Sequence, residues 1–326
     1  MSQERMVQTV TGRARPGELG RTLIHEHVLV GYPGWNLDAN APRYVRADAM
    51  VRGIDQLQEL KGLGVETFVD PCPMDLGRDV EFLAELSQRS GMRIVCTTGA
   101  YFEAEGVTHT FRHLPLEEIT AIYIKEIVDG VGDTGIKAGA VKIATGAPTI
   151  SDYERKLVQA GARAARETGV PLISHTQEAC CGHEQIDLVT GEGVSPERLV
   201  VGHSDGIDDP DYHRSLAERG AFVGFDRFGI TVILPDEVRV KNVLKLARAG
   251  HTRRILLSHD SIVCWQGRPV PFAYRHEDLL AMLPDWRPTS ILTKIVPQLL
   301  AGGLSEADVA TILVDNPRRF FAGSNS

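Results

Sequence analysis

The chain has 326 residues, and its 43% hydrophobic and 24% charged residues are the composition of an ordinary globular protein. Its net charge of −8, with no offsetting cluster of lysine and arginine, argues against nucleic acid or an anionic membrane as a partner. No apolar run is long enough to span a bilayer, and the first residues lack the apolar core of a secretory signal.

Short apolar runs alternate with amphipathic stretches along the chain. Strand candidates lie near 22–28, 65–70, 93–98, 139–143, 170–174, 199–202, 221–225 and 254–258, and helix candidates at 48–63, 78–90, 115–130, 152–168, 209–219 and 236–249. A glycine stands between a helix and the next strand five times, where a left-handed C-cap is wanted: Gly64, Gly91, Gly169, Gly220 and Gly250. The repeated unit predicts parallel strands, and eight of them predict a (β/α)8 barrel, or TIM barrel, in a single domain over 1–326.

Local signals mark where helices start and where loops are long. Ser151 and Glu154 form a capping box, and Ser305 starts the last helix in a similar way. Irregular stretches follow strands at 29–47, 71–77, 99–114 and 261–287. Long loops on that side are typical of the active face of a barrel.

Cysteine usage indicates the redox compartment. The five cysteines are an odd count without zinc-finger spacing: Cys72, Cys96, Cys180, Cys181 and Cys264. Reduced thiols are favoured, so we expect a cytoplasmic protein, although adjacent Cys180 and Cys181 leave a vicinal pair open.

Residue types that bind metals stand at the ends of the predicted strands. His25 and His27 flank Glu26, and alternation along a strand points both histidines to one side and Glu26 to the other. Four further candidates each follow a later apolar run: Lys142, His175, His203 and Asp260. Imidazole suits zinc, iron, cobalt or nickel, so the ligand type does not settle the metal. A carboxylate such as Asp260 can also accept a proton from metal-bound water.

Lys142 is the unusual member of this set. A protonated ammonium cannot bind a metal, and a strand-end lysine can simply extend toward solvent. If burial and nearby cations lower its pKa, however, the neutral amine can react with carbon dioxide. The resulting carbamate would bridge two metals as a carboxylate does.

The candidates follow the order His-x-His, Lys, His, His and Asp along strands one, four, five, six and eight. With this order the chain strongly resembles the phosphotriesterase family of the amidohydrolase superfamily, and within it the phosphotriesterase-like lactonases. The resemblance covers nearly the whole chain, through the segments 17–27, 136–145 and 316–321. It implies that His25, His27 and Asp260 hold a buried metal, that His175 and His203 hold an exposed one, and that carbamylated Lys142 and a hydroxide bridge the two. Zinc is the expected metal, with iron, cobalt or manganese as alternatives, and we expect a homodimer.

Two positions bear on the branch of the family. Arg227 stands where the lactonases typically carry arginine and the phosphotriesterases proper a histidine. Tyr101 resembles the lactonase tyrosine that lies over the metals and contacts the substrate. The plain alternatives are a surface salt bridge for Arg227 and a rim aromatic for Tyr101. The segment after Asp260 is shorter and less acidic than in the lactonases, and there Trp265 either lines the pocket or anchors the loop.

The resemblance implies a metal-dependent hydrolase in which a metal-bridging hydroxide attacks a lactone, either an acyl-homoserine lactone or another γ- or δ-lactone, with organophosphates as slower substrates. Alternatives on the same site are an amide, carbamate or ester hydrolase, or a true phosphotriesterase. A binding protein without turnover is disfavoured because both Lys142 and Asp260 are present, and a one-metal deaminase because Lys142 has no role in a one-metal site. His259 precedes Asp260, and alternation turns it away from the metals, so we expect it to be structural.

Overall fold

The computed structural model describes residues 5–106, 109–269 and 275–323. Several expectations concern residues outside these ranges: both ends of the single domain expected over 1–326, the first residues, where no signal is expected, and parts of the predicted loops 99–114 and 261–287. Within them, no helix is both long enough and apolar enough to cross a bilayer.

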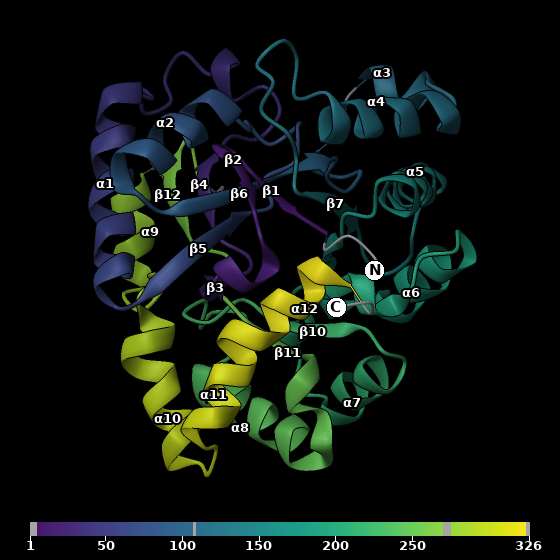
Figure 1. Ribbon diagram of the computed structural model, residues 1–326. Coiled ribbons are helices and arrows are strands. Elements are labelled where there is room, and N and C mark those ends of the chain that lie inside the picture. Colours follow the sequence, from purple (N-terminus) through teal and green to yellow (C-terminus); the bar gives the residue numbers. More distant parts are fainter. Residues whose placement is uncertain (1–4, 107–108, 270–274, 324–326) are drawn as a thin grey trace.

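Eight strands form one parallel sheet at the centre of the molecule, with the helices around it (Figure 1). In spatial order they are β3 (Arg21–Leu23), β5 (Val65–Asp70), β6 (Arg93–Gly99), β7 (Ala140–Thr145), β8 (Leu172–Thr176), β9 (Leu199–Val201), β10 (Phe222–Phe225) and β11 (Ile255–Leu257). All eight lie within or next to the predicted strand ranges. The predicted (β/α)8 barrel is confirmed.

The barrel closes where its first and eighth strands meet. Each is continued by a second piece, β4 (His27–Val30) and β12 (Ile262–Trp265), and these two pieces pair in parallel. Between them the Asp260 amide donates to the His25 carbonyl over 3.0 Å, and the His25 amide donates to Ser258 Oγ over 2.9 Å. The prediction that the stretch 261–287 is irregular is therefore wrong in part, because β12 and α9 (His276–Met282) lie within it. β12 is stabilised by a partner far away in the sequence, which no local pattern shows.

The helices cover the outside of the barrel. They are α1 (Arg46–Gly62), α2 (Val80–Ser90), α3 (His109–His113), α4 (Leu116–Val128), α5 (Asp152–Thr168), α6 (Gly182–Gly191), α7 (Pro210–Glu218), α8 (Asp236–Leu246), α9 (His276–Met282), α10 (Val296–Ala301), α11 (Glu306–Ala310) and α12 (Asn316–Ala322). All six predicted helices are present. The predicted capping box starts α5: Ser151 Oγ accepts from the Glu154 amide, and the Glu154 carboxylate accepts from the Ser151 amide. Gly169 ends the helix at a φ of 78°, where a side chain would be strained.

Besides β12, a hairpin and several helices were not predicted. The hairpin of β1 (Val7–Thr9) and β2 (Gly12–Ala14) precedes the barrel, α6 lies between the fifth and sixth barrel strands, and α3, α9 and α10 lie outside the predicted helix ranges. The hairpin strands have three residues each, too few to show a period.

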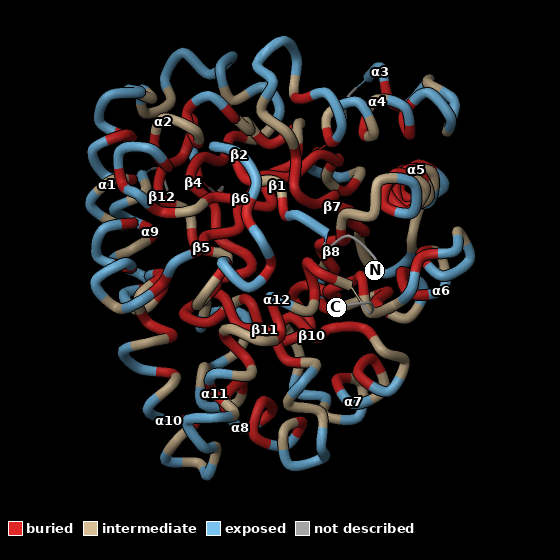
Figure 2. Tube along the Cα trace, in the orientation of Figure 1, coloured by how far each residue is buried: buried red, intermediate tan, exposed pale blue. Residues whose placement is uncertain are grey.

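The apolar core has two layers, one outside and one inside the barrel. The inside layer contains Ala140, Ile173 and Phe222, and Phe222 packs on Phe320 of α12 with ring centroids 5.6 Å apart. Buried residues accordingly fill the centre, and exposed residues lie on the outer faces of the helices (Figure 2). Since alternate residues of a strand share a face, the side chains two positions beyond Ala140 and Ile173 also point inward. These residues are Lys142 and His175.

Candidate metal centre and active site

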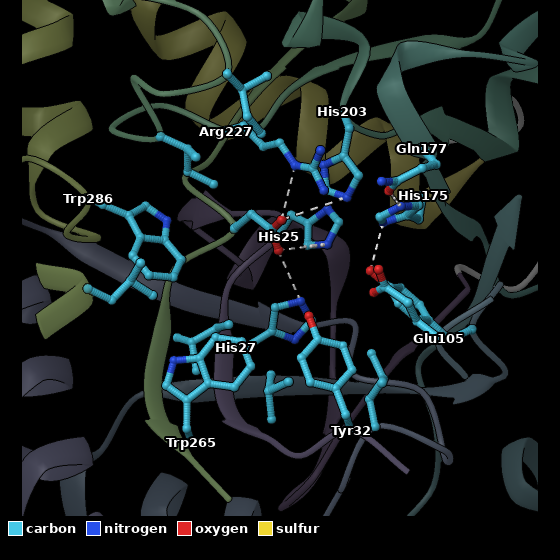
Figure 3. Close-up of a pocket in the computed structure, with 18 of the residues that line it drawn as sticks. His25, His27, Tyr32, Glu105, His175, Gln177, His203, Arg227, Trp265 and Trp286 are labelled. Carbon is cyan, nitrogen blue, oxygen red and sulfur yellow. Dashed lines mark hydrogen bonds and ion pairs between the residues drawn. The ribbon is translucent and has the colours of Figure 1, made fainter. Parts of the chain in front are cut away.

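The structure brings all eight predicted site residues to one cavity of about 410 Å³: His25, His27, Tyr101, Lys142, His175, His203, Arg227 and Asp260. The four histidines converge at one side of it, with Trp265 and Trp286 on the other (Figure 3). All four imidazoles and Lys142 are buried. Strand ends that lie far apart in the sequence therefore meet at one barrel mouth, as the sequence predicts.

One group of donors comes from the first and eighth strands. Asp260 Oδ1 lies 3.2 Å from His27 Nε2 and 3.6 Å from His25 Nε2. One ligand atom from each of the three residues lies within 4.8 Å of the other two. Two imidazoles and a carboxylate at this spacing form a donor set that fits a divalent cation.

The backbone of Asp260 is unusual, because its φ of 54° lies in the left-handed region. Such a conformation costs about 1–3 kcal/mol in a residue other than glycine and persists only where the surroundings enforce it. Here the hydrogen bond from its amide to the His25 carbonyl holds it, and the turn aims its carboxylate into the cavity.

The second group of donors comes from the fifth and sixth strands. The rings of His175 and His203 lie 4.4 Å apart at 84°. His175 Nε2 donates to Gln177 Oε1 over 2.9 Å, which leaves Nδ1 with its lone pair, 3.3 Å from the Tyr101 hydroxyl. His203 Nε2 lies 3.8 Å from Asp260 Oδ2, so the Asp260 carboxylate stands between the two groups. The donors present fit a site for two cations.

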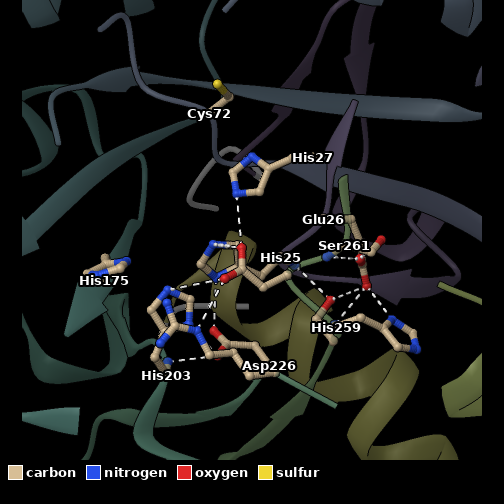
Figure 4. Close-up of polar contacts among 12 residues, drawn as sticks. His25, Glu26, His27, Cys72, His175, His203, Asp226, His259 and Ser261 are labelled. Carbon is tan, nitrogen blue, oxygen red and sulfur yellow. Dashed lines mark hydrogen bonds and ion pairs between the residues drawn. The ribbon is translucent and has the colours of Figure 1, made fainter. Parts of the chain in front are cut away.

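Buried carboxylates orient these imidazoles (Figure 4). Asp226 accepts from His25 Nδ1 with one oxygen and from His203 Nδ1 with the other, each over 2.9 Å. Asp70 lies 3.3 Å from His27 Nδ1. Since the Nδ1 atoms carry these protons, the Nε2 lone pairs of His25, His27 and His203 are left for a cation. Asp70 and Asp226 were missed as site residues, although each is a polar residue at the carboxyl end of an apolar strand.

Lys142 lies among these ligands. Its Nζ is 3.0 Å from His25 Nε2, and its side chain is buried. Burial lowers the pKa of Lys142 from 10.5 to about 8, against the opposing effect of Asp260 and Asp226. Roughly a tenth of the amine is therefore neutral at pH 7, far more than for a lysine with its usual pKa, and the neutral form is the one that carbamylation requires.

The charge states of His203, His175 and Asp260 suit metal binding. Burial and Arg227 lower the pKa of His203 to about 3, and burial and His203 hold that of His175 well below 6.5. Burial alone would raise the pKa of Asp260, but His203, His27, His25 and Arg227 together hold it well below 3.8. Neutral imidazoles and an anionic carboxylate are the forms that bind cations. His27 differs, because burial favours its neutral form but hydrogen bonds to Asp260 and Asp70 raise its pKa well above 6.5, so its imidazole must release a proton when a cation binds.

Tyr101 and Arg227 both point into the cavity. The Arg227 side chain is largely buried, with Nε 3.3 Å from Asp260 Oδ2, so it does not form a surface salt bridge. Burial raises the pKa of Tyr101 well above 10, which keeps its hydroxyl protonated as a hydrogen-bond donor. Tyr101 is also fixed from behind, because its amide donates to the Asp75 carboxylate.

Glu26 points away from the cavity, as strand alternation predicts, but its role there was not foreseen. Its buried carboxylate accepts from the amides and side chains of His259 and Ser261 and from the Ser258 hydroxyl. His259 Nε2 in turn accepts from the Ile291 amide over 2.9 Å. Glu26 and His259 therefore tie the first strand to the eighth strand and to the segment beyond it. Figure 4 shows Glu26 with His259 and Ser261, which are the two sequence neighbours of Asp260.

The rest of the cavity wall is mostly apolar. Trp265 lines the cavity and also belongs to β12, so it both lines the pocket and anchors the segment after Asp260. Its ring stacks on Tyr32 with the ring centroids 5.8 Å apart. Further apolar lining comes from Leu76, Ile230, Val232, Ile233, Ile262, Leu279, Leu283 and Trp286. Tyr32, Glu105 and Trp286 were not predicted, because each lies in a loop where the sequence carries no period.

Comparison with known proteins agrees with this geometry. The profile of the Phosphotriesterase family matches residues 5–321. An aryldialkylphosphatase of Saccharolobus solfataricus is 33% identical over 94% of this chain and 96% of its own length. Among solved structures, an organophosphorus hydrolase from Deinococcus radiodurans superposes with a TM-score of 0.92 at 39% identity, covering 98% of both chains. A mutant of a phosphotriesterase-like lactonase from the same organism reaches 0.91 at 38% identity, covering 97% of this chain and 99% of its own. The chain belongs to the phosphotriesterase family and is a metal-dependent hydrolase.

Proposed function

We propose that this enzyme hydrolyses lactones, either acyl-homoserine lactones or other γ- and δ-lactones, and hydrolyses organophosphate triesters as slower, secondary substrates. The main support is Arg227, which stands beside the catalytic carboxylate where the phosphotriesterases proper carry a histidine. The likeness to a phosphotriesterase-like lactonase adds to it. The apolar wall of the cavity suits an ester with an aliphatic substituent.

The proposed ligands are His25, His27, Lys142, His175, His203 and Asp260, with Lys142 as a carbamate made from carbon dioxide. Zinc is the proposed metal, and iron, cobalt and manganese are the alternatives. When bound, two such ions supply an activated water and polarise the oxygen of the substrate.

The residues of the chain do the rest. The Tyr101 hydroxyl is placed to donate to the oxygen of the substrate carbonyl, where negative charge develops. Arg227 pairs with Asp260 and holds its carboxylate toward the cavity. Asp260 accepts the proton of the attacking water and delivers it to the leaving alkoxide. The apolar wall excludes bulk water and strengthens these interactions.

The remaining properties are proposed from the sequence and from exposed surfaces. We propose a single domain over 1–326 and a homodimer. Leu37, Val45 and Val51 are exposed apolar residues on α1 and the segment before it, which a partner subunit would cover. The five cysteines have no disulfide partner, which supports a reducing, cytoplasmic compartment.

The test is a substrate panel on metal-reconstituted protein: acyl-homoserine lactones, γ- and δ-lactones, simple esters, amides, carbamates and paraoxon. We expect the highest kcat/KM on a lactone. If paraoxon exceeds every lactone, the enzyme is a phosphotriesterase proper and the inference from Arg227 is wrong. If an amide, carbamate or simple ester leads, the binuclear chemistry stands and the lactonase assignment falls.

A further inference from the structure

Two adjacent thiols lie beside the metal centre without belonging to it. Cys180 and Cys181 occupy the connection between β8 and α6, and their Sγ atoms are 3.3 Å apart. Both thiols are directed at one acceptor, the Pro148 carbonyl, at 3.3 and 3.5 Å. Cys180 is partly exposed, whereas Cys181 is buried. The two sulfurs are thus already in contact, and one of them can be reached from solvent.

The backbone around this pair is strained. Glu178, Ala179 and Cys181 have φ values of 56°, 54° and 65°, in the left-handed region that favours glycine. Each such residue costs energy and persists where the surroundings enforce it. Here the turn brings both side chains to the same carbonyl, and it is anchored at both ends. The Cys180 amide donates to the Gln177 carbonyl over 3.0 Å, and the Gln185 amide donates to the Cys181 carbonyl over 2.9 Å.

We propose that Cys180 and Cys181 are a redox modification site, at which a small-molecule disulfide such as oxidised glutathione converts the two thiols to a vicinal disulfide. Cys180, the accessible thiol, loses its proton and attacks one sulfur of the small disulfide; that S–S bond breaks, and one thiol leaves with the proton. Cys181 then attacks the Cys180 sulfur of the mixed disulfide, and the second small thiol leaves. The pair loses two electrons and two protons, and the small disulfide gains both.

The order of attack follows from the surroundings of the two thiols. Burial, with Cys180 next to it, raises the pKa of the Cys181 thiol to about 12. Cys181 therefore reacts only after Cys180 has formed the mixed disulfide, when an electrophilic sulfur is held against it. The other three cysteines are buried far from this pair in the sequence.

The modification reaches the active site through Gln177. A disulfide requires the two sulfurs to approach from 3.3 Å to about 2.05 Å, so the strained turn must move. At the start of this turn the Cys180 amide donates to the Gln177 carbonyl. The side chain of Gln177 orients His175, since its Oε1 accepts from His175 Nε2 over 2.9 Å. Loss of such an orienting partner typically reduces metal affinity or activity about 10–100-fold. This consequence depends on the proposed role of His175 as a metal ligand, whereas the thiol chemistry does not.

The experiment treats the metal-loaded enzyme with oxidised glutathione and blocks the remaining thiols. It then measures the mass of the peptide containing Cys180 and Cys181, the metal content, and kcat/KM on the best substrate. We expect this peptide to lose the mass of two hydrogens, and kcat/KM to fall about 10–100-fold and recover with dithiothreitol.

Variants separate the pair from other effects. C180S and C181S should keep the activity of the reduced enzyme and resist the loss on oxidation. C264S, which changes a thiol on another part of the molecule, should lose activity as the unaltered enzyme does. No disulfide in the peptide, or two stable glutathione adducts, would refute the modification site. A complete disulfide with unchanged metal content and turnover would refute its connection to His175. Because peptide mass and metal content need no substrate, failure of the lactonase proposal would leave this test intact.

Discussion

Asp226 offers the sharpest test of how the site is built, because one carboxylate orients an imidazole of each metal-ligand group. It accepts from His25 Nδ1 and His203 Nδ1, each over 2.9 Å, and from the His203 amide over 2.7 Å. An asparagine has one acceptor oxygen, and its amide group would face an imidazole N–H. D226N therefore leaves one of the two histidines without an acceptor, free to turn or to change tautomer.

The expected magnitude follows from the number of histidines released. Loss of one orienting partner typically costs about 10–100-fold in metal affinity, which corresponds to about 1.4–2.7 kcal/mol. D70N is the matched control, since Asp70 contacts a single imidazole, at the longer distance of 3.3 Å. We expect D226N to lose more metal affinity than D70N, because each hydrogen bond from Asp226 to an imidazole is shorter than the contact of Asp70. D70N should weaken only the ion bound by His27.

The assay is competition for zinc with a chromophoric chelator, combined with metal content per chain after dialysis and with kcat/KM. Circular dichroism of the variants checks that each is folded. If D226N binds two ions with the affinity of the unaltered enzyme, or if D70N loses more than D226N, then the carboxylates do not orient the ligands as argued.

Three further predictions concern the proposed proton transfer by Asp260, the proposed carbamylation of Lys142 and the closure of the barrel. D260N should lower kcat by about 10²–10⁴-fold even when fully metallated, because the amide cannot carry the proton; near-normal turnover would remove Asp260 from the mechanism. Burial lowers the pKa of Lys142 to about 8, and only the neutral amine reacts with carbon dioxide. At a fixed concentration of dissolved carbon dioxide, reactivation of metal-free enzyme by zinc should therefore accelerate as pH rises and level off above about 8. A lysine with its usual pKa would be about 0.3% neutral at pH 8, so a rate that keeps rising to about pH 10 would contradict the shift. E26Q should lower the free energy of unfolding of the metal-free protein by about 3–5 kcal/mol in urea, because it leaves buried donors of His259 and Ser261 without a carboxylate. An unchanged urea midpoint would show that Glu26 does not hold the first and eighth strands together.

The sequence predicts the barrel and the positions of the site residues because both follow local rules. Strand alternation places His25 and His27 on one face, and a ligand at the carboxyl end of each strand must reach the same barrel mouth. The orienting carboxylates were missed because an aspartate at a strand end has the same pattern whether it binds a cation or an imidazole. β12 was missed since its partner, β4, lies more than two hundred residues away.

The charges around the proposed ligands link the proposed carbamylation of Lys142 to metal binding. We count the charged groups in contact with these ligands, with the imidazoles neutral as in the form that binds cations. Without metal, the carboxylates are Asp70, Asp226 and Asp260, the cations are Lys142 and Arg227, and the sum is −3 + 2 = −1. Carbamylation replaces the lysine cation by an anion, so the sum becomes −4 + 1 = −3. Two divalent ions add +4 and bring the site to +1, a charge that one anionic nucleophile cancels. A carbamate alone would place three unbalanced charges in a buried site, and two ions beside a lysine cation would leave +3 there. Carbamylation and metal binding therefore stabilise each other. When metal-free enzyme is reactivated, zinc and bicarbonate added together should restore activity far faster than zinc alone or bicarbonate alone.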